Sequence, residues 1–314
     1  MAIDYVALAR ELAGLRELAA QKVRKEPLPT DRDAQRHVRE EVHRLGLASN
    51  ILDLETKGYT VLPPGSAAPT EFCDRLRDTI LAIAEKDCPF ATDPGRPRGH
   101  LLWHLLPRDQ IFEQALMAER PLALVAYLLG YRAKLSQCTG IVKDETSTEA
   151  FQFHADQSRK IPAPWPSDAQ FCTVTWVLSD YTRENGSVCV LPGTHKLCRD
   201  VPDEMVLGHD HPDVVPVEAQ AGSVIVWHGA LWHGAFPRSS PGQRVSLAMP
   251  MVRFHLLAQE LFWASTAPEM IERNSSRFAA LMGLVGSWPW GVDGPDTGYE
   301  RPSWLTTRCE NRFA

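Results

Sequence analysis

The sequence lacks the features that would assign it to a nucleic-acid or membrane protein. It has no excess of basic residues, since its formal net charge is −6 and its pI is about 6.0. The basic face that nucleic acid requires is therefore not expected. Its longest apolar run, from Leu122 to Gly130, falls well short of the roughly 20 residues of a membrane span. These absences favour a protein that acts on a small molecule and binds neither nucleic acid nor a membrane.

Paired cysteines are also lacking. The seven cysteines are widely scattered and none forms a C-x-x-C pair. An odd, scattered set is a poor basis for a disulfide framework or a zinc ribbon. The chain begins Met-Ala-Ile-Asp, without the basic start and apolar stretch of a signal peptide. We therefore expect a reducing, cytoplasmic setting.

What the sequence does contain is a change of texture along its length. Residues 1–55 predict two helices separated at Pro27 and Pro29, and residues 70–86 predict an amphipathic helix. Two shorter helices are predicted within 109–130, and residues 58–62 predict a strand. From about 133 to 255, short β-rich runs alternate with Gly, Pro, Asn and Asp clusters; these runs are 133–143, 151–154, 171–178, 187–191, 214–218, 223–227 and 244–253. So many strands without intervening helices predict a mainly-β fold with flanking helices, as an antiparallel sandwich or jelly roll.

The sharpest motif is His154-Ala155-Asp156 at the end of one of these runs. Residues i and i+2 of a strand point to the same side, so an imidazole and a carboxylate converge. Two further histidines, His228 and His233, lie downstream, and either could complete the set. Two histidines and one carboxylate leave three positions of an octahedral metal open, as an O2-activating Fe(II) enzyme requires.

An arginine, Arg244, follows His233 by eleven residues and begins a predicted strand. Its planar guanidinium could hold the distal carboxylate of a keto acid by a bidentate pair, which the point charge of a lysine does less well. Arg238 is a rival, although it lies in a Pro/Ser-rich turn.

Residues 176–196, WVLSDYTRENGSVCVLPGTHK, resemble the phytanoyl-CoA dioxygenase (PhyH) family, which carries a similar strand, N-G turn and V-L-P-G-[ST]-H-K run between its H-x-D motif and its distal histidine. The resemblance covers about residues 56–255. It implies a double-stranded β-helix (a cupin-like jelly roll) that uses Fe(II), 2-oxoglutarate and O2. By motif position it implies His154, Asp156 and His233 as iron ligands, and Arg244 as the 2-oxoglutarate arginine.

Two positions bear on what the resemblance implies: one differs from several relatives, and the other retains a carboxylate that some relatives lack. Several relatives have a hydroxyl residue where this chain has Ala235, so we expect Gln137 or Thr173 to supply that contact to 2-oxoglutarate. Some halogenating relatives lack the carboxylate of H-x-D. The retention of Asp156 therefore favours hydroxylation or a related oxidation.

Three further residues are candidates for contact with the substrate. The loop 158–169 directly follows the first two ligands, and we predict that it closes over the substrate with Trp165 as its largest apolar side chain. His228 and Trp232, which flank the turn before His233, are expected to face the substrate or support the site.

The function expected from these features is an Fe(II)- and 2-oxoglutarate-dependent dioxygenase that oxidises a small to medium hydrophobic metabolite, such as a natural-product intermediate, and releases succinate and CO2. We expect an N-terminal helical segment (1–55), a catalytic β-helix (56–255) and a C-terminal helical extension (256–314). Two alternatives stay open. A zinc-dependent hydrolase could use the same ligands with no need for Arg244, and a non-catalytic β-helix binding protein would tolerate loss of any one ligand. The sequence also leaves homo-oligomer formation open.

Overall fold

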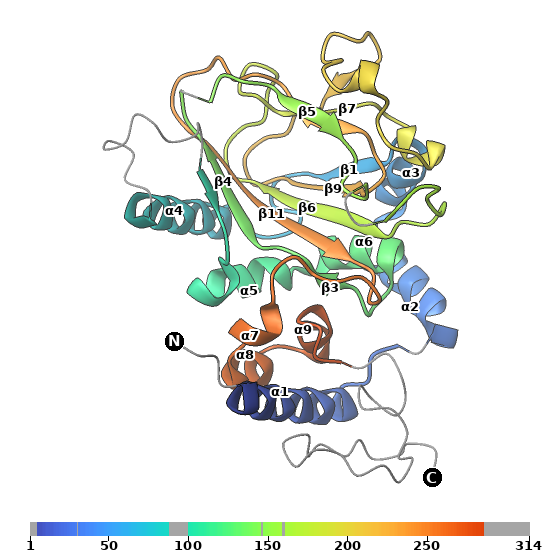
Figure 1. Ribbon diagram of the computed structural model, residues 1–314, viewed down its shortest axis with the longest axis vertical. Helices are drawn as coiled ribbons and strands as arrows, with labels where there is room; N and C mark the ends of the chain where they lie inside the picture. The colour runs from blue at the N-terminus through green and yellow to red at the C-terminus, as the bar shows by residue number, and fades with distance from the viewer. Residues whose placement is uncertain (1–4, 30, 88–99, 146, 159–160, 286–314) are drawn as a thin grey trace.

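The protein folds as two facing antiparallel sheets with helices packed against the larger one, as the computed structural model shows (Figure 1). The structure describes residues 5–29, 31–87, 100–145, 147–158 and 161–285. The major sheet has the strand order β1-β9-β6-β11-β4-β2, with β3 also paired to β11, and the minor sheet has the order β5-β10-β7-β8. The strands are β1 (Tyr59–Leu62), β2 (His100–Leu102), β3 (Lys134–Leu135), β4 (Thr139–Lys143), β5 (Phe151–His154), β6 (Phe171–Val177), β7 (Val188–Val190), β8 (Val215–Pro216), β9 (Val224–His228), β10 (His233–Ala235) and β11 (Arg244–Val252).

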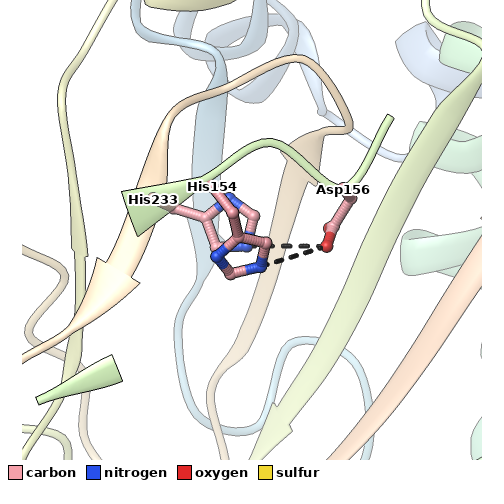
Figure 2. Close-up of side chains that lie close together, drawn as sticks. All are labelled: His154, Asp156 and His233. Carbon is pink, nitrogen blue, oxygen red and sulfur yellow. Dashed lines mark ion pairs between the residues drawn. The ribbon is translucent and has the colours of Figure 1, made fainter. Parts of the chain in front are cut away.

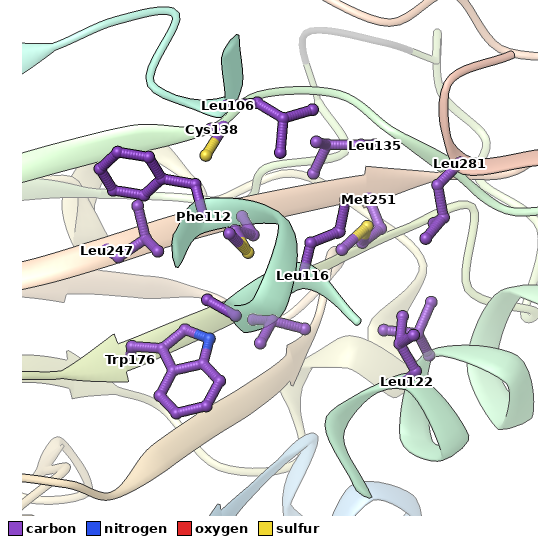
Figure 3. Close-up of a cluster of buried hydrophobic side chains, with 14 of the residues drawn as sticks. Leu106, Phe112, Leu116, Leu122, Leu135, Cys138, Trp176, Leu247, Met251 and Leu281 are labelled. Carbon is purple, nitrogen blue, oxygen red and sulfur yellow. The ribbon is translucent and has the colours of Figure 1, made fainter. Parts of the chain in front are cut away.

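Helices cover the face of the major sheet that lies away from the minor sheet. Side chains of α5 and α6, among them Phe112 and Leu122, pack with Trp176 of β6 and Leu247 of β11 in one buried cluster (Figure 3). Because side chains alternate along a strand, every second residue of β6 and β11 enters this cluster. The helices are α1 (Tyr5–Lys25), α2 (Asp31–Arg44), α3 (Ala48–Lys57), α4 (Thr70–Asp87), α5 (Gln110–Leu116), α6 (Glu119–Leu129), α7 (Phe262–Ser265), α8 (Pro268–Arg273) and α9 (Ser276–Leu281).

The opposite face of the major sheet, here called the inner face, looks toward the minor sheet. Thr173 identifies the side chains of this face, because its hydroxyl donates to Asp156, which lies just beyond the end of β5 in the minor sheet. The register of the ladders places the alternate residues of β4, β6 and β11 on the same side. The inner-face residues of these strands are Thr139, Ile141, Lys143, Thr173, Thr175, Val177, Arg244, Ser246, Ala248 and Pro250.

The helices at the two ends of the described chain pack against each other. α1 contacts α7, α8 and α9, on the far side of the helical layer from the minor sheet (Figure 1). A buried carboxylate, Glu113 of α5, ties this group to the core by accepting hydrogen bonds from Arg273 and Asn274. In the described part of the chain, no helix is both long and apolar enough to cross a membrane.

The predicted mainly-β class with flanking helices is confirmed, but several elements differ from the prediction. Residues 1–55 hold three helices, because Gly46, with φ +64°, ends α2 before α3 begins. The run 133–143 is divided into β3 and β4. Two short strands, β2 and β10, were not predicted. In β10 the centre is Gly234, where a Cβ would lie 2.5 Å from the carbonyl oxygen of Phe151, so the close approach of β5 requires glycine there.

Candidate metal centre

His154, Asp156 and His233 come together between the two sheets. His154 ends β5 and pairs directly with His233, the first residue of β10, while Asp156 lies two residues beyond the strand. The Nε2 atoms of His154 and His233 lie 3.6 and 3.7 Å from Asp156 Oδ1 (Figure 2). Among the residues that the structure describes, this is the one group of three histidine, cysteine or acidic side chains close enough to share a metal ion.

Each of these side chains is held by the atom that faces away from the centre. The Nδ1 atoms of His154 and His233 lie 3.0 and 2.9 Å from the carbonyl oxygens of Gln152 and Leu231. A carbonyl can only accept, so Nδ1 of each ring is the donor to the backbone and Nε2 is the atom directed toward Asp156. This support orients both rings before a metal arrives.

The carboxylate of Asp156 is divided in the same way. Its Oδ2 accepts hydrogen bonds from the Thr173 hydroxyl (2.8 Å) and from Trp227 Nε1 (3.0 Å). Its Oδ1 is left to face the two imidazoles. One oxygen is thus committed to the protein and the other is directed to the centre.

The charges are those a metal ion requires at neutral pH. Burial lowers the pKa of His233 to about 4, so this ring is neutral. Burial alone would raise the pKa of the Asp156 carboxyl, but the His233 and His154 rings and the Thr173 hydroxyl outweigh that effect and lower it, so Asp156 is ionised. Neutral imidazole and ionised carboxylate are the forms that bind metals.

The donor set fits Fe(II). Two imidazole nitrogens and one carboxylate oxygen on one side of an octahedral ion leave three positions for other ligands. The His154 side chain is 32% exposed and that of His233 only 6%, so the centre opens to solvent on the side of His154. Zinc could use the same three donors, and the surroundings must distinguish the two metals.

The inner face beside the centre carries buried polar atoms with no partner. Among the described residues, the hydroxyls of Thr139, Thr175 and Ser246 and Nε of Arg244 are buried without a hydrogen bond. Arg244 is 3% exposed, and its guanidinium donates to the Gly186 carbonyl and stacks 4.8 Å over the Tyr181 ring. Unsatisfied buried donors cost about 1–3 kcal/mol each, so this row of atoms fits an anionic, oxygen-rich ligand such as 2-oxoglutarate.

The other residues predicted to contact 2-oxoglutarate, Thr173 and Gln137, and the rival arginine Arg238 have surroundings that differ from those of Arg244. The hydroxyl of Thr173 donates to Asp156, whereas the hydroxyls of Thr175 and Ser246 are buried without a partner. Gln137 is half-buried after β3, where its main-chain N–H donates to Pro250. The rival arginine Arg238 is buried and donates to the Pro241 and Gly242 carbonyls of its own turn and to the Asn185 side chain of a second turn, while its Nη1 is buried without a hydrogen bond. Thr175 and Ser246 could have been found in the sequence from the alternation that continues from Thr173 and Arg244.

The three residues predicted to contact the substrate or support the site have side chains that point away from the metal centre. Trp227 points to Asp156, so the next residue, His228, points to the opposite side of β9, where its ring lies 5.2 Å from that of His195. Trp165 and Trp232 are buried together in a cluster with Phe153, behind the minor sheet. Alternation explains this placement, because Phe153 and Trp232 each precede a ligand that faces inward.

The packing of Trp165 leads to a stability prediction. Its side chain is 5% exposed, and its Nε1 donates to the Ile161 carbonyl. Trp165→Ala is expected to lower the free energy of unfolding by about 3–5 kcal/mol, as large-to-small changes in a core do, and to leave 2-oxoglutarate affinity unchanged. Thermal unfolding measures the first and calorimetric titration the second. Trp103→Ala is the control, because Trp103 is 40% exposed and should cost much less. Unaltered stability with weakened substrate binding would restore the lid interpretation.

The fold places the protein in a known class. The chain is similar in structure to HygX from Streptomyces hygroscopicus, solved with nickel and 2-oxoglutarate bound, with a TM-score of 0.54, 18% identity, and coverage of 66% of this chain and 86% of that one. EctD from S. alaskensis, solved with bound Fe, gives a TM-score of 0.53 at 20% identity, covering 66% and 76%. This is the jelly-roll fold of the iron- and 2-oxoglutarate-dependent oxygenases, which confirms the predicted fold.

The sequence comparison then identifies the family. Residues 54–246 match the family model of phytanoyl-CoA dioxygenase (PhyH), and the chain belongs to this family of Fe(II)- and 2-oxoglutarate-dependent dioxygenases, as predicted. It is 34% identical over 188 residues to Dioxygenase af480 of Aspergillus fumigatus, covering 57% of this chain and 58% of the relative. It is 34% identical over 97 residues to Phytanoyl-CoA dioxygenase 1 of Oryza sativa subsp. japonica, covering 27% and 34%. The chain thus spans less than two thirds of the length of either relative.

Proposed function

We propose that this chain is an Fe(II)- and 2-oxoglutarate-dependent dioxygenase that oxidises a small to medium hydrophobic molecule and releases succinate and CO2. The observation that carries the proposal is the combination of His154, Asp156 and His233 with a buried arginine and unpartnered hydroxyls on the same inner face. A zinc hydrolase would need the three ligands but not the anion-binding row, so it is the weaker candidate.

Different residues would bind the iron, support its ligands and orient the co-substrate. His154, Asp156 and His233 would hold the iron, and Thr173 and Trp227 keep Oδ1 of Asp156 directed at it. The bound iron and keto acid supply the chemistry of O2 activation. The side chains of the inner face orient the co-substrate.

Arg244 would hold the distal carboxylate of 2-oxoglutarate through its free Nε and the guanidinium edge around it, with the Ser246 and Thr175 hydroxyls donating to the same ligand. Retention of Asp156 supports hydroxylation or a related oxidation over halogenation, because the carboxylate occupies a coordination position.

The substrate would approach between the edge strands β2 and β5. Each ends the strand order of its sheet, and both carry exposed apolar side chains. Leu101 of β2 pairs with Ile141 on the inner face and is 57% exposed. Phe151 of β5 is also 57% exposed, and its ring stands edge-on to the His154 ring with centroids 5.1 Å apart. Exposed apolar side chains on these two edge strands support a hydrophobic substrate.

A pair of substitutions tests this approach. Leu101→Ser and Phe151→Ser should each raise the KM for the prime substrate by about tenfold, since each removes a contact of roughly 1.5 kcal/mol. The fraction of succinate formed without product should rise, while 2-oxoglutarate affinity stays constant. Candidate hydrophobic compounds are first screened by succinate release. Leu52→Ser on α3 is the control, because Leu52 is 63% exposed and remote in sequence and fold. A KM that both variants leave unchanged would place the substrate elsewhere.

The extent of the catalytic unit and its compartment are part of the same proposal. We place catalysis in residues 56–255, flanked by helical segments 1–55 and 256–314. The ligands and the inner face support this division, since all of them lie between Thr139 and Pro250.

The cysteines that the structure describes are free, which supports a reducing compartment such as the cytoplasm; they are Cys73, Cys138, Cys172, Cys189 and Cys198.

A further inference from the structure

A lysine lies directly beside the buried arginine. Lys143, the last residue of β4, pairs in register with Arg244, the first residue of β11. Directly paired residues of antiparallel strands have Cβ atoms about 4.5–5.5 Å apart and point to the same side. Both side chains therefore project from the inner face at the same level. Arg244 is fully buried and Lys143 half-buried.

The surroundings of Lys143 hold an excess of positive charge. The charged groups that lower its pKa are Arg244 and Arg238, and the thiol of Cys189 on β7 acts on it in the opposite sense. Burial raises the pKa of that thiol to about 12, so Cys189 is neutral. The neighbouring acids Asp144 and Glu145 act on Arg238. Burial, together with Arg244 and Arg238, lowers the pKa of Lys143 to about 8. Like charges gathered in a partly desolvated place are unfavourable unless an anion joins them.

We propose that Lys143 is a second cation for the distal carboxylate of 2-oxoglutarate, and that it makes co-substrate affinity depend on pH in the neutral to alkaline range. The inference rests on the proposed function and adds a residue that the sequence motifs do not single out. Arg244 supplies a fixed charge, since an arginine side chain stays protonated in proteins. Lys143 supplies a charge that can be withdrawn.

The sign of the pH effect follows from the lysine. Below pH 8 its ammonium is charged and attracts the carboxylate. The bound anion stabilises the ammonium further, so affinity is greatest at neutral pH and declines as the pH rises above about 8. A carboxylate held by arginine alone would show no such decline.

The test is calorimetric titration of 2-oxoglutarate into the Mn(II)-loaded protein between pH 7 and pH 9, which measures binding without turnover. Wild-type affinity should fall by about tenfold over this range, the loss expected for one charge-assisted contact. Lys143→Met should bind about tenfold more weakly at pH 7 and show little further loss. Lys143→Arg should keep the affinity of the wild type at pH 7 and retain it at pH 9.

A keto acid without the distal carboxylate separates the effect of that carboxylate from the effect of binding at the metal. 2-Oxobutyrate offers the same keto-acid end without the distal carboxylate, so Lys143→Met should leave its affinity unchanged at each pH. Equal 2-oxoglutarate affinities for Lys143→Met and wild type, or a wild-type affinity that follows the pH course of 2-oxobutyrate, would overturn the role of Lys143 alone. If wild type binds no 2-oxoglutarate, the proposed function itself fails. Should Lys143→Met not fold, the wild-type pH course and Lys143→Arg still decide the matter.

Discussion

Asp156→Ala and His233→Ala are expected to abolish substrate-dependent succinate formation while the protein stays folded. Each would remove one of the three proposed metal donors, and for Asp156 also the acceptor of two hydrogen bonds. Loss of an outer partner of a metal ligand typically costs 10–100-fold in metal affinity, so loss of a ligand itself should cost at least about 100-fold. Metal content after dialysis, calorimetric Fe(II) binding and succinate release measure the effect, with circular dichroism as the check on folding.

His228→Ala is the matched control for these variants. His228 is as buried as His233, at 5% exposed in each case, but it lies on the other side of its strand. It should retain metal binding and succinate formation, with any loss confined to thermal stability. Normal metal binding in His233→Ala together with its loss in His228→Ala would mean that the third ligand is wrongly assigned.

Arg244→Leu is expected to weaken 2-oxoglutarate binding by 30-fold or more, because truncating one partner of a buried charge-assisted pair costs about 2–5 kcal/mol. The apparent KM for the prime substrate should change much less. Titration of the metal-loaded protein with 2-oxoglutarate measures the first quantity and steady-state kinetics the second.

Arg238→Leu provides the comparison for Arg244. It removes a second buried arginine, whose hydrogen bonds hold its own turn and join that turn to Asn185. We expect a lower melting temperature and a change in 2-oxoglutarate affinity of less than about threefold, the range of a nearby charge that makes no contact. If the larger effect on 2-oxoglutarate falls on Arg238, the carboxylate anchor lies in the turn.

The ligand set could be proposed from sequence because it depends on local geometry and ordered motifs. His154 and Asp156 are two residues apart at a strand end, so their convergence follows from the period of a strand. Arg244 begins a strong nine-residue strand, which its β-rich composition predicts. His233 needed the family resemblance, because its own strand has only three residues and contains a glycine.

The outer contacts could not be predicted because they depend on which way each strand faces. Trp232 and His233 are neighbours in sequence but point to opposite sides of β10, and only the pairing with β5 decides which faces the metal. A one-residue change of register would exchange them. The hydrogen bond from the Thr173 hydroxyl to Asp156 likewise joins strand β6 to the segment that follows β5. For the same reason the position of Lys143 beside Arg244 could not be predicted from sequence, because it depends on the register between β4 and β11.

The most direct test of the account is the visible spectrum of the anaerobic protein with Fe(II) and 2-oxoglutarate. A keto acid chelated to Fe(II) gives a weak metal-to-ligand charge-transfer band, and the account predicts this band for wild type and for His228→Ala. It predicts no band for Asp156→Ala or His233→Ala, and a band that needs far more 2-oxoglutarate for Arg244→Leu. A wild-type protein that binds Fe(II) yet shows no band at saturating 2-oxoglutarate would contradict the central claim.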